Sequence, residues 1–376
     1  MVEATAGSMA RDIDEERVFI ATQWQLMWWR FKRHRAALVA TGVIIALYLV
    51  SIGAGFLAMS NPSEGEVTHA YMPPQMIHFF DGGFKPHVKG VITGRDPFTL
   101  KKIHTPDPEV IVPISLWVTG FEYEFLGLFK TKRHLIGIGG EFQEDRPAPF
   151  FFGSDKLGRD IFSRMVYGTR LSMMIGLIGV AISLFLGISL GGISGFYGGI
   201  ADTVIQRLIE ILRSIPTIPL WIALAAAVPR DWSPIRIFFS ITIIISLISW
   251  TELGRVVRGR FLALREEEFV TAARLSGATD IRIIFRHMVP SFTSHVIAAA
   301  SLSIPAMIIA ETALSFLGLG LRPPAISWGV LLKDAQNIQS VAVYPWIMYP
   351  AVPVVIAVLG FNFMGDGLRD AADPYG

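Results

Sequence analysis

The sequence predicts an all-α polytopic membrane protein with six transmembrane helices. Of its 376 residues, 52% are hydrophobic and 17% are charged, against about 25% charged in an ordinary globular chain. The mean hydropathy of +0.49 agrees with this composition. A soluble fold of this length could not bury so much apolar surface, and disordered chains are poor in apolar residues. The net charge of +2 is too small to indicate a nucleic-acid partner, and the lack of cysteine excludes disulfides and thiolate sites.

Stretches without Asp, Glu, Lys or Arg mark the expected spans, because about 20 apolar residues are needed to cross a bilayer as a helix. Three stretches are long enough by themselves, namely 36–63, 171–201 and 335–365. A fourth, 288–310, is interrupted only by a histidine. Two shorter candidates, 214–229 and 237–251, reach spanning length if a charged residue at one end lies at the interface.

Basic residues in the short loops set the expected orientation, since lysine and arginine concentrate on the cytoplasmic side. Four basic residues lie between 30 and 35, before the first span, and seven arginines lie between 255 and 286, before the fifth. We expect both regions, and therefore both termini, in the cytoplasm. The expected division is a cytoplasmic tail (1–35), a first span (36–59), an outer segment (60–168), a membrane domain (169–366) and a second cytoplasmic tail (367–376).

The residues just before the first span have the pattern of an amphipathic helix. Trp24, Met27, Trp28 and Phe31 are interspersed with glutamine and arginine. Such a helix lies in the plane of the membrane interface. The alternative is a poorly ordered tail with a few membrane-anchoring tryptophans.

The long outer segment is rich in proline and glycine and contains short apolar runs such as 110–118. We expect it to be partly folded, as a small β-containing cap. Five of the eight histidines of the chain lie in it: His69, His78, His87, His104 and His134. Their spacing fits no compact ligand motif, so we expect no metal site.

The stretch 260–290 predicts a helix, a tight turn and a second helix at the membrane surface. One narrow, uncharged face is formed at helical spacing by Phe269, Ala272, Ala273 and Ser276. Gly277 is placed to end this helix, because glycine accepts the left-handed conformation. Thr279 or Asp280 can then cap a second helix over 281–287. The small side chains would let another protein approach the backbone closely.

This stretch resembles the EAA loop of ATP-binding-cassette (ABC) importer permeases. Their pattern is Glu-Ala-Ala, three residues, Gly, nine residues, Ile, any residue and Leu-Pro. Here Thr271 replaces the Glu, with Glu268 one turn earlier as a substitute, His287 replaces the Ile, and the spacing from Gly277 to Pro290 is intact. The resemblance implies an ATPase-coupling loop within 262–290, formed by Glu268, Phe269, Thr271, Ala272, Ala273, Ser276, Gly277, His287 and Pro290.

Four further stretches, 153–172, 195–220, 315–332 and 364–374, resemble the C-type permeases of dipeptide and oligopeptide importers. The resemblance implies a type I ABC importer permease fold, here with an enlarged periplasmic segment between the first two spans. It also implies a bacterial inner-membrane location, a homologous B-type permease, two ABC ATPase subunits and a periplasmic solute-binding protein. ATP and Mg would be bound by the ATPases, and this chain would bind no cofactor.

The sequence contains no phosphate-binding loop and no H-E-x-x-H or G-x-S-x-G motif, so we expect no enzyme activity. Importers of opines, oligosaccharides or nickel are alternatives to a peptide importer. A channel or secondary transporter that works alone is a further alternative. Repeated broken helices and a cluster of ionisable residues at mid-membrane, which are typical of secondary transporters, are not evident in the sequence.

Some residues within the spans suggest packing or pathway roles. Gly187, Gly191 and Gly195 recur every fourth residue, as in a ridge that lets helices approach closely, although a sliding surface between moving helices is the alternative. Pro216 and Pro305 favour bends and are candidates to flank a pathway. Glu311 is the acidic residue well inside a span, so we expect it to line or gate the pathway. An interhelical hydrogen bond is its alternative role.

Overall fold

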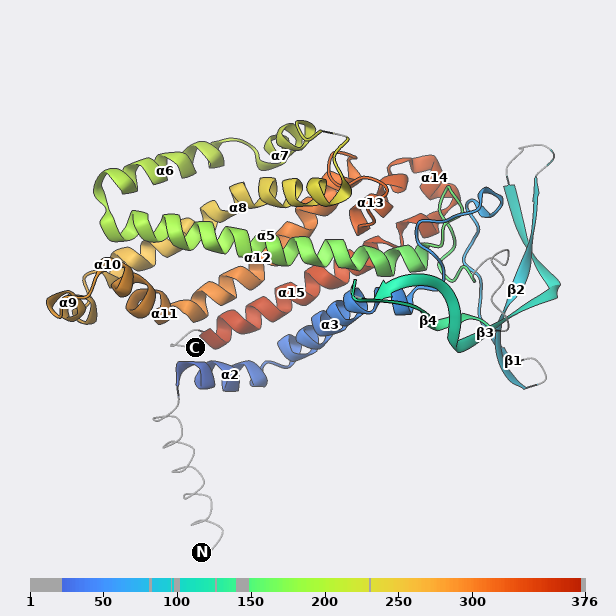
Figure 1. Ribbon diagram of the computed structural model, residues 1–376, viewed down its shortest axis with the longest axis horizontal. Helices are drawn as coiled ribbons and strands as arrows, with labels where there is room; N and C mark the ends of the chain where they lie inside the picture. Colours follow the sequence, from blue (N-terminus) through green and yellow to red (C-terminus); the bar gives the residue numbers. More distant parts are fainter. Residues whose placement is uncertain are drawn as a thin grey trace, which may run out of the picture.

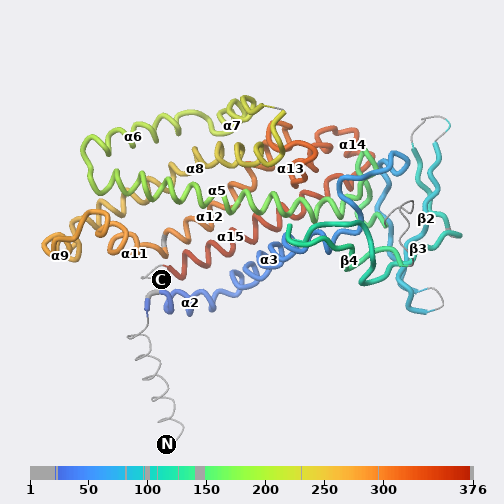
Figure 2. The backbone as a smooth tube through the Cα atoms, viewed as in Figure 1, coloured from blue at the N-terminus to red at the C-terminus, as the bar shows by residue number. Residues whose placement is uncertain are grey.

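The computed structural model describes residues 22–80, 83–95, 97, 102–125, 127–139, 149–229 and 231–372. Long helices run side by side along the longest axis of the molecule, and a small β-sheet lies at one end (Figures 1 and 2). The long helices are α3 (Arg35–Ile52), α5 (Ile161–Tyr197), α6 (Gly199–Ser214), α8 (Pro234–Leu264), α12 (Thr293–Phe316) and α15 (Ala351–Ala372). The shorter helices are α2 (Gln23–Arg33), α4 (Ala54–Leu57), α7 (Thr217–Ala226), α9 (Glu268–Leu275), α10 (Asp280–Arg282), α11 (Val289–Ser291), α13 (Trp328–Leu332) and α14 (Ile338–Val343).

Five helices within the described residues are long and apolar enough to cross a membrane, and the bent pair α6 and α7 raises the number to six if it counts as one span. The predicted span 214–229 is wrong as a single helix. Helix α7 rises only about 15 Å, too little for a hydrocarbon core of about 30 Å, and it turns 90° away from α6. Proline at 216 causes the break, because the preceding Ile215 takes an extended backbone.

Other predicted boundaries shift for related reasons. Helix α5 begins ten residues before the predicted span, at Ile161, because Asp160 caps it and Arg164 is buried within it. In the predicted span 335–365, the long helix α15 starts only at Ala351, after the short elements η3 (Lys333–Gln336), α14 and η4 (Pro345–Met348), and the candidate span begins at Pro345. The absence of charged residues from a stretch of sequence therefore does not by itself predict where a helix begins or ends.

Helices α5 and α8 pack closely along the predicted ridge of small residues. A Cβ on Gly187 would lie 2.9 Å from the Leu253 side chain. One on Gly191 would lie 2.4 Å from the Gly254 carbonyl oxygen, and one on Gly195 would lie 2.6 Å from Phe261 Cβ. Glycine is therefore required at 191 and 195, where an added carbon would meet backbone, whereas at 187 it would press on the Leu253 side chain.

Within the outer segment, residues 78–138 contain a four-stranded antiparallel sheet, in agreement with the expected β-containing cap, so the predicted all-α class applies to the helix bundle and not to the whole chain. Its strands, in the order β1-β2-β3-β4, are β1 (His78–Phe80), β2 (Phe84–Arg95), β3 (Lys102–Phe125) and β4 (Phe129–Ile138). The register pairs Val88 with Val112 and Leu116 with Ile136. β-Branched residues fit such a pleated surface, which explains the structure of the apolar run 110–118.

The sheet and helices α9 to α11 lie at opposite ends of the helix bundle (Figure 1). The C-terminal end of α15 lies at the α9 end, as does α2 (Figure 2). Phe31, Ala37 and Ala371 form a small buried cluster there. Within the predicted tails, α2 forms a helix and α15 continues to Ala372, while 1–21 and 373–376 lie outside the described residues.

Candidate functional site

The segment from α9 to α11, which we call the docking unit (268–291), has a turn fixed by its backbone. Gly277 has a φ of +77°, in the region that glycine tolerates best. Its N–H donates to the Arg274 carbonyl at 3.0 Å, and the Ala278 N–H donates to the Ala273 carbonyl at 3.1 Å. These are the two hydrogen bonds of a Schellman motif, which ends a helix at a defined residue. Thr279 precedes α10 as expected, but its side chain makes no capping hydrogen bond.

Buried side chains anchor the docking unit, while large apolar side chains remain exposed on it. Val270, Ile283 and Met288 are fully buried against α8 and its neighbours. In contrast, Leu275 is 86% exposed and Phe285 is 63% exposed. A rigid base with an uncovered apolar surface is typical of a site that another protein covers.

Polar contacts connect the docking unit to the ends of α5 and α8. The Arg274 guanidinium lies 5.3 Å from the centre of the Phe196 ring. Arg265 Nη1 donates to the Gly195 carbonyl at 3.4 Å. Nearby, Arg258 on α8 donates two hydrogen bonds of 2.6 Å to Asp202 on α6. Arg274 thus holds the docking unit against the end of α5, and the arginines of α8 bond the ends of α5 and α6 beside it.

The residues predicted from the EAA-like pattern all lie on or next to this unit. Phe269 is 39% exposed, and six others are exposed as well: Glu268, Thr271, Ala272, Ser276, Gly277 and Pro290. Ala273 and His287 are half-buried, and Ser276 and Gly277 form the turn. His287 belongs to a π-helical turn, η2 (Ile283–Met288). Such turns are rare in proteins, and those that occur are often at functional sites.

Sequence reasoning missed the most exposed apolar residues of the unit, which are Leu275, Ile281 and Phe285. Each lies beside an arginine or aspartate, so the charged neighbours concealed the apolar positions. The three-residue spacing of Ala272 and Leu275 could have placed Leu275 on the same helix face as the predicted contact residues. That these side chains are exposed and not buried could not be read from the sequence.

Glu311 is fully buried, in a polar cluster between α12, α5 and α13. Its Oε1 accepts hydrogen bonds from Ser315 and Ser327 at 2.8 Å, and its Oε2 accepts one from Ser172 at 3.4 Å. The Ser172 hydroxyl in turn accepts from the Trp328 N–H at 3.1 Å. The side chain is thus enclosed by protein and makes the hydrogen bonds between helices that were its alternative role, while its predicted role in the pathway stays a prediction.

The two candidate prolines lie in different surroundings. Pro216 is exposed at the 90° break between α6 and α7. Pro305 is buried inside α12, which continues without interruption to Phe316. A bend that could shape a pathway is therefore present at Pro216.

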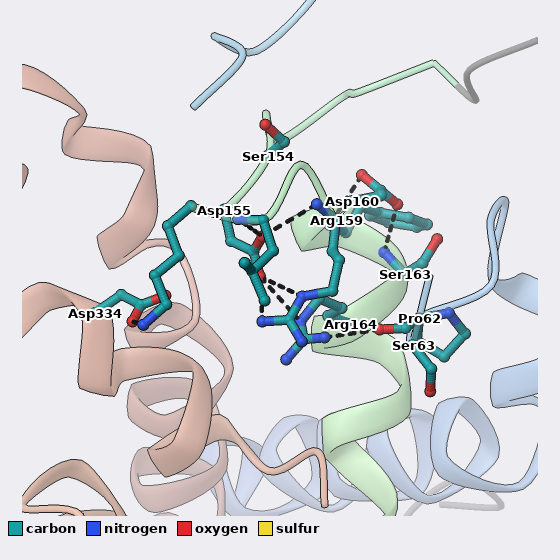
Figure 3. A network of polar contacts seen from close by, with 12 residues as sticks. Pro62, Ser63, Ser154, Asp155, Arg159, Asp160, Ser163, Arg164 and Asp334 are labelled. Carbon is teal, nitrogen blue, oxygen red and sulfur yellow. Dashed lines mark hydrogen bonds and ion pairs between the residues drawn. The ribbon is translucent and has the colours of Figure 1, made fainter. Parts of the chain in front are cut away.

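A second polar cluster holds the start of α5 at the sheet end of the bundle (Figure 3). The Asp155 carboxylate accepts hydrogen bonds from the backbone and the guanidinium of Arg159, the latter at 2.7 Å. Arg164 Nη1 donates to the Pro62 carbonyl at 2.7 Å, and Lys156 pairs with Asp334 at 2.8 Å. The cluster therefore joins the chain after the first span, the start of α5 and the segment before α14.

Asp160 caps α5 within this cluster. Its carboxylate accepts hydrogen bonds from the Ser163 N–H at 2.7 Å and the Phe162 N–H at 3.3 Å. Burial raises the pKa of this carboxyl to about 6, and the hydrogen bonds from Ser163 and Phe162 counteract only part of the shift.

Comparison with known proteins identifies the family. Residues 183–375 match the model of the binding-protein-dependent transport system inner membrane component, and residues 22–74 match that of the N-terminal transmembrane domain of oligopeptide transport permease C. The dipeptide transport system permease protein DppC of Alkalihalophilus pseudofirmus is 41% identical over 73% of this chain and 97% of its own length. The oligopeptide transport system permease protein OppC of Bacillus subtilis is 38% identical over 60% of this chain and 71% of its own length.

A solved structure of the MetNI methionine ABC transporter in an inward-facing conformation aligns with 57% of this chain and 98% of its own, with 17% identity and a TM-score of 0.43. The relatives are transport permeases and not enzymes. With a family model that covers more than half of the chain and a relative matched over nearly its whole length, the chain belongs to the family of binding-protein-dependent transport system inner membrane components and is a multi-pass permease subunit of an ABC importer.

Proposed function

We propose that the docking unit couples this permease to ATPase subunits that drive import. The chain would pair with a homologous B-type permease, and the pair would contact two ABC ATPases that bind ATP and Mg. A periplasmic solute-binding protein would deliver the solute at the sheet end. The observation that carries this proposal is the exposed apolar surface of the docking unit, which projects from the end of the bundle on a buried base.

The contacts beneath the unit support a role in transmission. Arg274 links it to the end of α5, Arg265 at the end of α8 bonds the Gly195 carbonyl of α5, and α5 is packed against α8 through its glycines. A force applied to α9 would therefore move two spans together. A flexible loop that only set the membrane topology would need neither the Schellman turn nor the buried base.

The arginines around the docking unit favour a cytoplasmic position for this end of the bundle. Both termini would then be cytoplasmic, and the sheet would be periplasmic. The exposed Trp24 and Trp28 of α2, with Lys32 Nζ 5.0 Å from the Trp28 ring, would lie in the inner membrane interface. Reaction of introduced cysteines with an impermeant reagent on intact cells tests this orientation.

For the solute, we propose short peptides, because the relatives described above are named for dipeptide and oligopeptide transport. The bend at Pro216 would shape part of the pathway, with Pro305 and Glu311 stabilising the helices around it. Native mass spectrometry of the cognate binding protein identifies the solute. Recovery of a sugar, an opine or a metal ion in place of a peptide would contradict this assignment.

The test of coupling is copurification of the ATPase subunits with variants of the docking unit. We expect Leu275→Asp and Phe285→Asp to lower the retained ATPase at least tenfold, because each places a charge on an exposed apolar contact. Ala273→Asp and Gly277→Arg should act in the same direction, although the second also strains the turn. As a matched control, Leu128→Asp alters a side chain that is 78% exposed at the sheet end and should retain the ATPases. Normal retention by the docking-unit variants would refute the proposal.

A further inference from the structure

Trp117 in strand β3 has an unusual backbone. Its φ is +59°, a region that bulky residues rarely occupy, and its side chain is 64% exposed. The residues on either side pair regularly with β4, Leu116 with Ile136 and Val118 with His134. The distortion is therefore confined to one residue, and such local strain is typical of positions with a functional constraint.

The Trp117 ring lies against the end of the first span. Its centre is 5.4 Å from that of the Phe56 ring on α4, which follows α3 after Gly53. The neighbouring Gly55 is in close contact with Tyr123, also on β3, because a Cβ at Gly55 would lie 2.2 Å from that ring. Strand β3 therefore contacts the end of the span at two points.

Phe56 lies at the end of an exposed apolar stripe on the first span. Ile45, Leu49 and Ile52 are spaced by four and three residues, so they share one face, and they are 54%, 62% and 44% exposed. Phe56 lies four residues after Ile52, on α4, beyond the break at Gly53. Trp117 therefore extends a lipid-facing stripe beyond the end of the helix that carries it.

The length of the first span sets the depth of this contact. From Arg35, the first residue of α3, to Phe56 the rise is about 30 Å at 1.5 Å per residue, which is the thickness of a hydrocarbon core. Arginine at one interface places Phe56 and Trp117 at the other, where tryptophan and tyrosine are concentrated.

A second pair of side chains occurs at the same level. Arg170 Nε donates to the Ser51 carbonyl at 2.9 Å, and its guanidinium lies 5.1 Å from the Tyr167 ring. An aromatic ring beside a basic group that bonds the end of a span is a common arrangement at headgroup level.

We propose that Trp117 binds lipid and fastens the β3–β4 hairpin to the leaflet on the side of the sheet. Its strained backbone directs an exposed ring onto Phe56, so that the apolar stripe of the first span continues into the headgroup region. The strands thus form an interfacial element as well as a cap. This inference requires only that α3 spans the membrane and does not depend on what the transporter carries.

The absence of cysteine from the chain allows a direct test. Single variants Trp117→Cys and Leu128→Cys, labelled with a polarity-sensitive fluorophore, are compared in the assembled transporter in nanodiscs of phosphatidylethanolamine and phosphatidylglycerol. We expect nitroxide lipids labelled near the headgroup to quench the label at 117 several-fold more than the label at 128. Aqueous iodide should show the reverse. Leu49→Cys serves as the positive control, quenched by a nitroxide deep in the acyl chain.

Two outcomes would overturn the proposal. Equal quenching by iodide at 117 and 128 would place Trp117 in water, and protection of 117 from both quenchers would place it against a protein partner. A second measurement uses the native side chain. The fraction of the total emission that brominated lipids quench should be smaller in Trp117→Phe than in the unmodified protein, while the contribution of Trp24 and Trp28 remains. An unchanged quenched fraction would also refute lipid contact.

Discussion

The two ends of the helix bundle are built in opposite ways. At the α9 end, a short helical unit leaves Leu275 and Phe285 exposed above a buried base. At the sheet end, the charged side chains of Asp155, Asp160 and Arg164 are almost fully buried and bonded to one another or to nearby backbone (Figure 3). The first end leaves these apolar side chains exposed, whereas the charged cluster at the second is enclosed by protein.

This difference suits the two ends to different roles. Apolar side chains remain exposed where a partner can cover them, and covering them contributes binding free energy. Buried charges with fixed geometry contribute little net binding but hold segments in one arrangement. Under the proposed function, the buried cluster at the sheet end would hold the start of α5 in place while a movement entered at the docking unit.

The largest expected loss of stability comes from the packing of α5 against α8, the two helices that run between the ends of the bundle. Gly191→Leu would drive a side chain into the Gly254 backbone, 2.4 Å from the first added carbon. We expect a loss of more than about 3 kcal/mol and little assembled protein, because overpacking against backbone cannot be relieved by a rotamer change. Size-exclusion chromatography after detergent extraction measures this. Gly259→Ala, where an added Cβ meets nothing within 4 Å, is the matched control. Intact assembly of Gly191→Leu with impaired uptake would favour a sliding surface instead.

Removal of one carboxylate at the sheet end should destabilise that end without changing the docking unit. Asp155→Ala removes the acceptor of the Arg159 guanidinium and the negative charge 3.7 Å from Arg164 Nε in a buried site, which costs about 3 to 5 kcal/mol. We expect a lower melting temperature in detergent, while ATPase retention through the docking unit persists below that temperature. Unchanged melting would show that the cluster does not hold the sheet end together.

The sequence predicted those features that depend on residues close to one another in the chain. The position of Gly277 predicted the turn, and the glycine spacing predicted a packing ridge, because both depend on neighbours along one helix. The criterion of charge-free stretches failed at the start of α5, since Arg164 is buried there by a bond to Pro62, about one hundred residues away in the chain. The pairing of Asp155 with Arg159 and the φ of Trp117 depend likewise on tertiary contacts that no local pattern shows.

The Asp160 carboxyl should make the sheet end sensitive to pH. Because burial raises its pKa from 3.8 to about 6, the folded protein retains a proton that the unfolded chain has released between these values. Stability therefore falls as pH rises from about 4 to about 6, by about 2 to 3 kcal/mol, and stays lower above that range. Asp160→Asn keeps a capping oxygen and carries no charge, so its melting temperature should fall less between pH 5 and pH 7, as differential scanning fluorimetry can measure. An equal fall in both proteins would assign the effect to other groups.

The smallest expected effect lies between the two ends, at Glu311. In Glu311→Gln the amide oxygen can still accept from Ser315 and Ser327, and the amide nitrogen can donate to the Ser172 hydroxyl, which both donates and accepts. We expect normal expression and a change in stability below about 1 kcal/mol. Glu311→Ala should cost more, because it leaves these buried hydroxyls without their acceptor. Uptake of labelled solute decides the remaining question. A purely structural Glu311 leaves uptake in the Gln variant unchanged, which would end its candidacy as a pathway residue, whereas loss of uptake in a stable Gln variant would require the buried carboxylate to become exposed during transport.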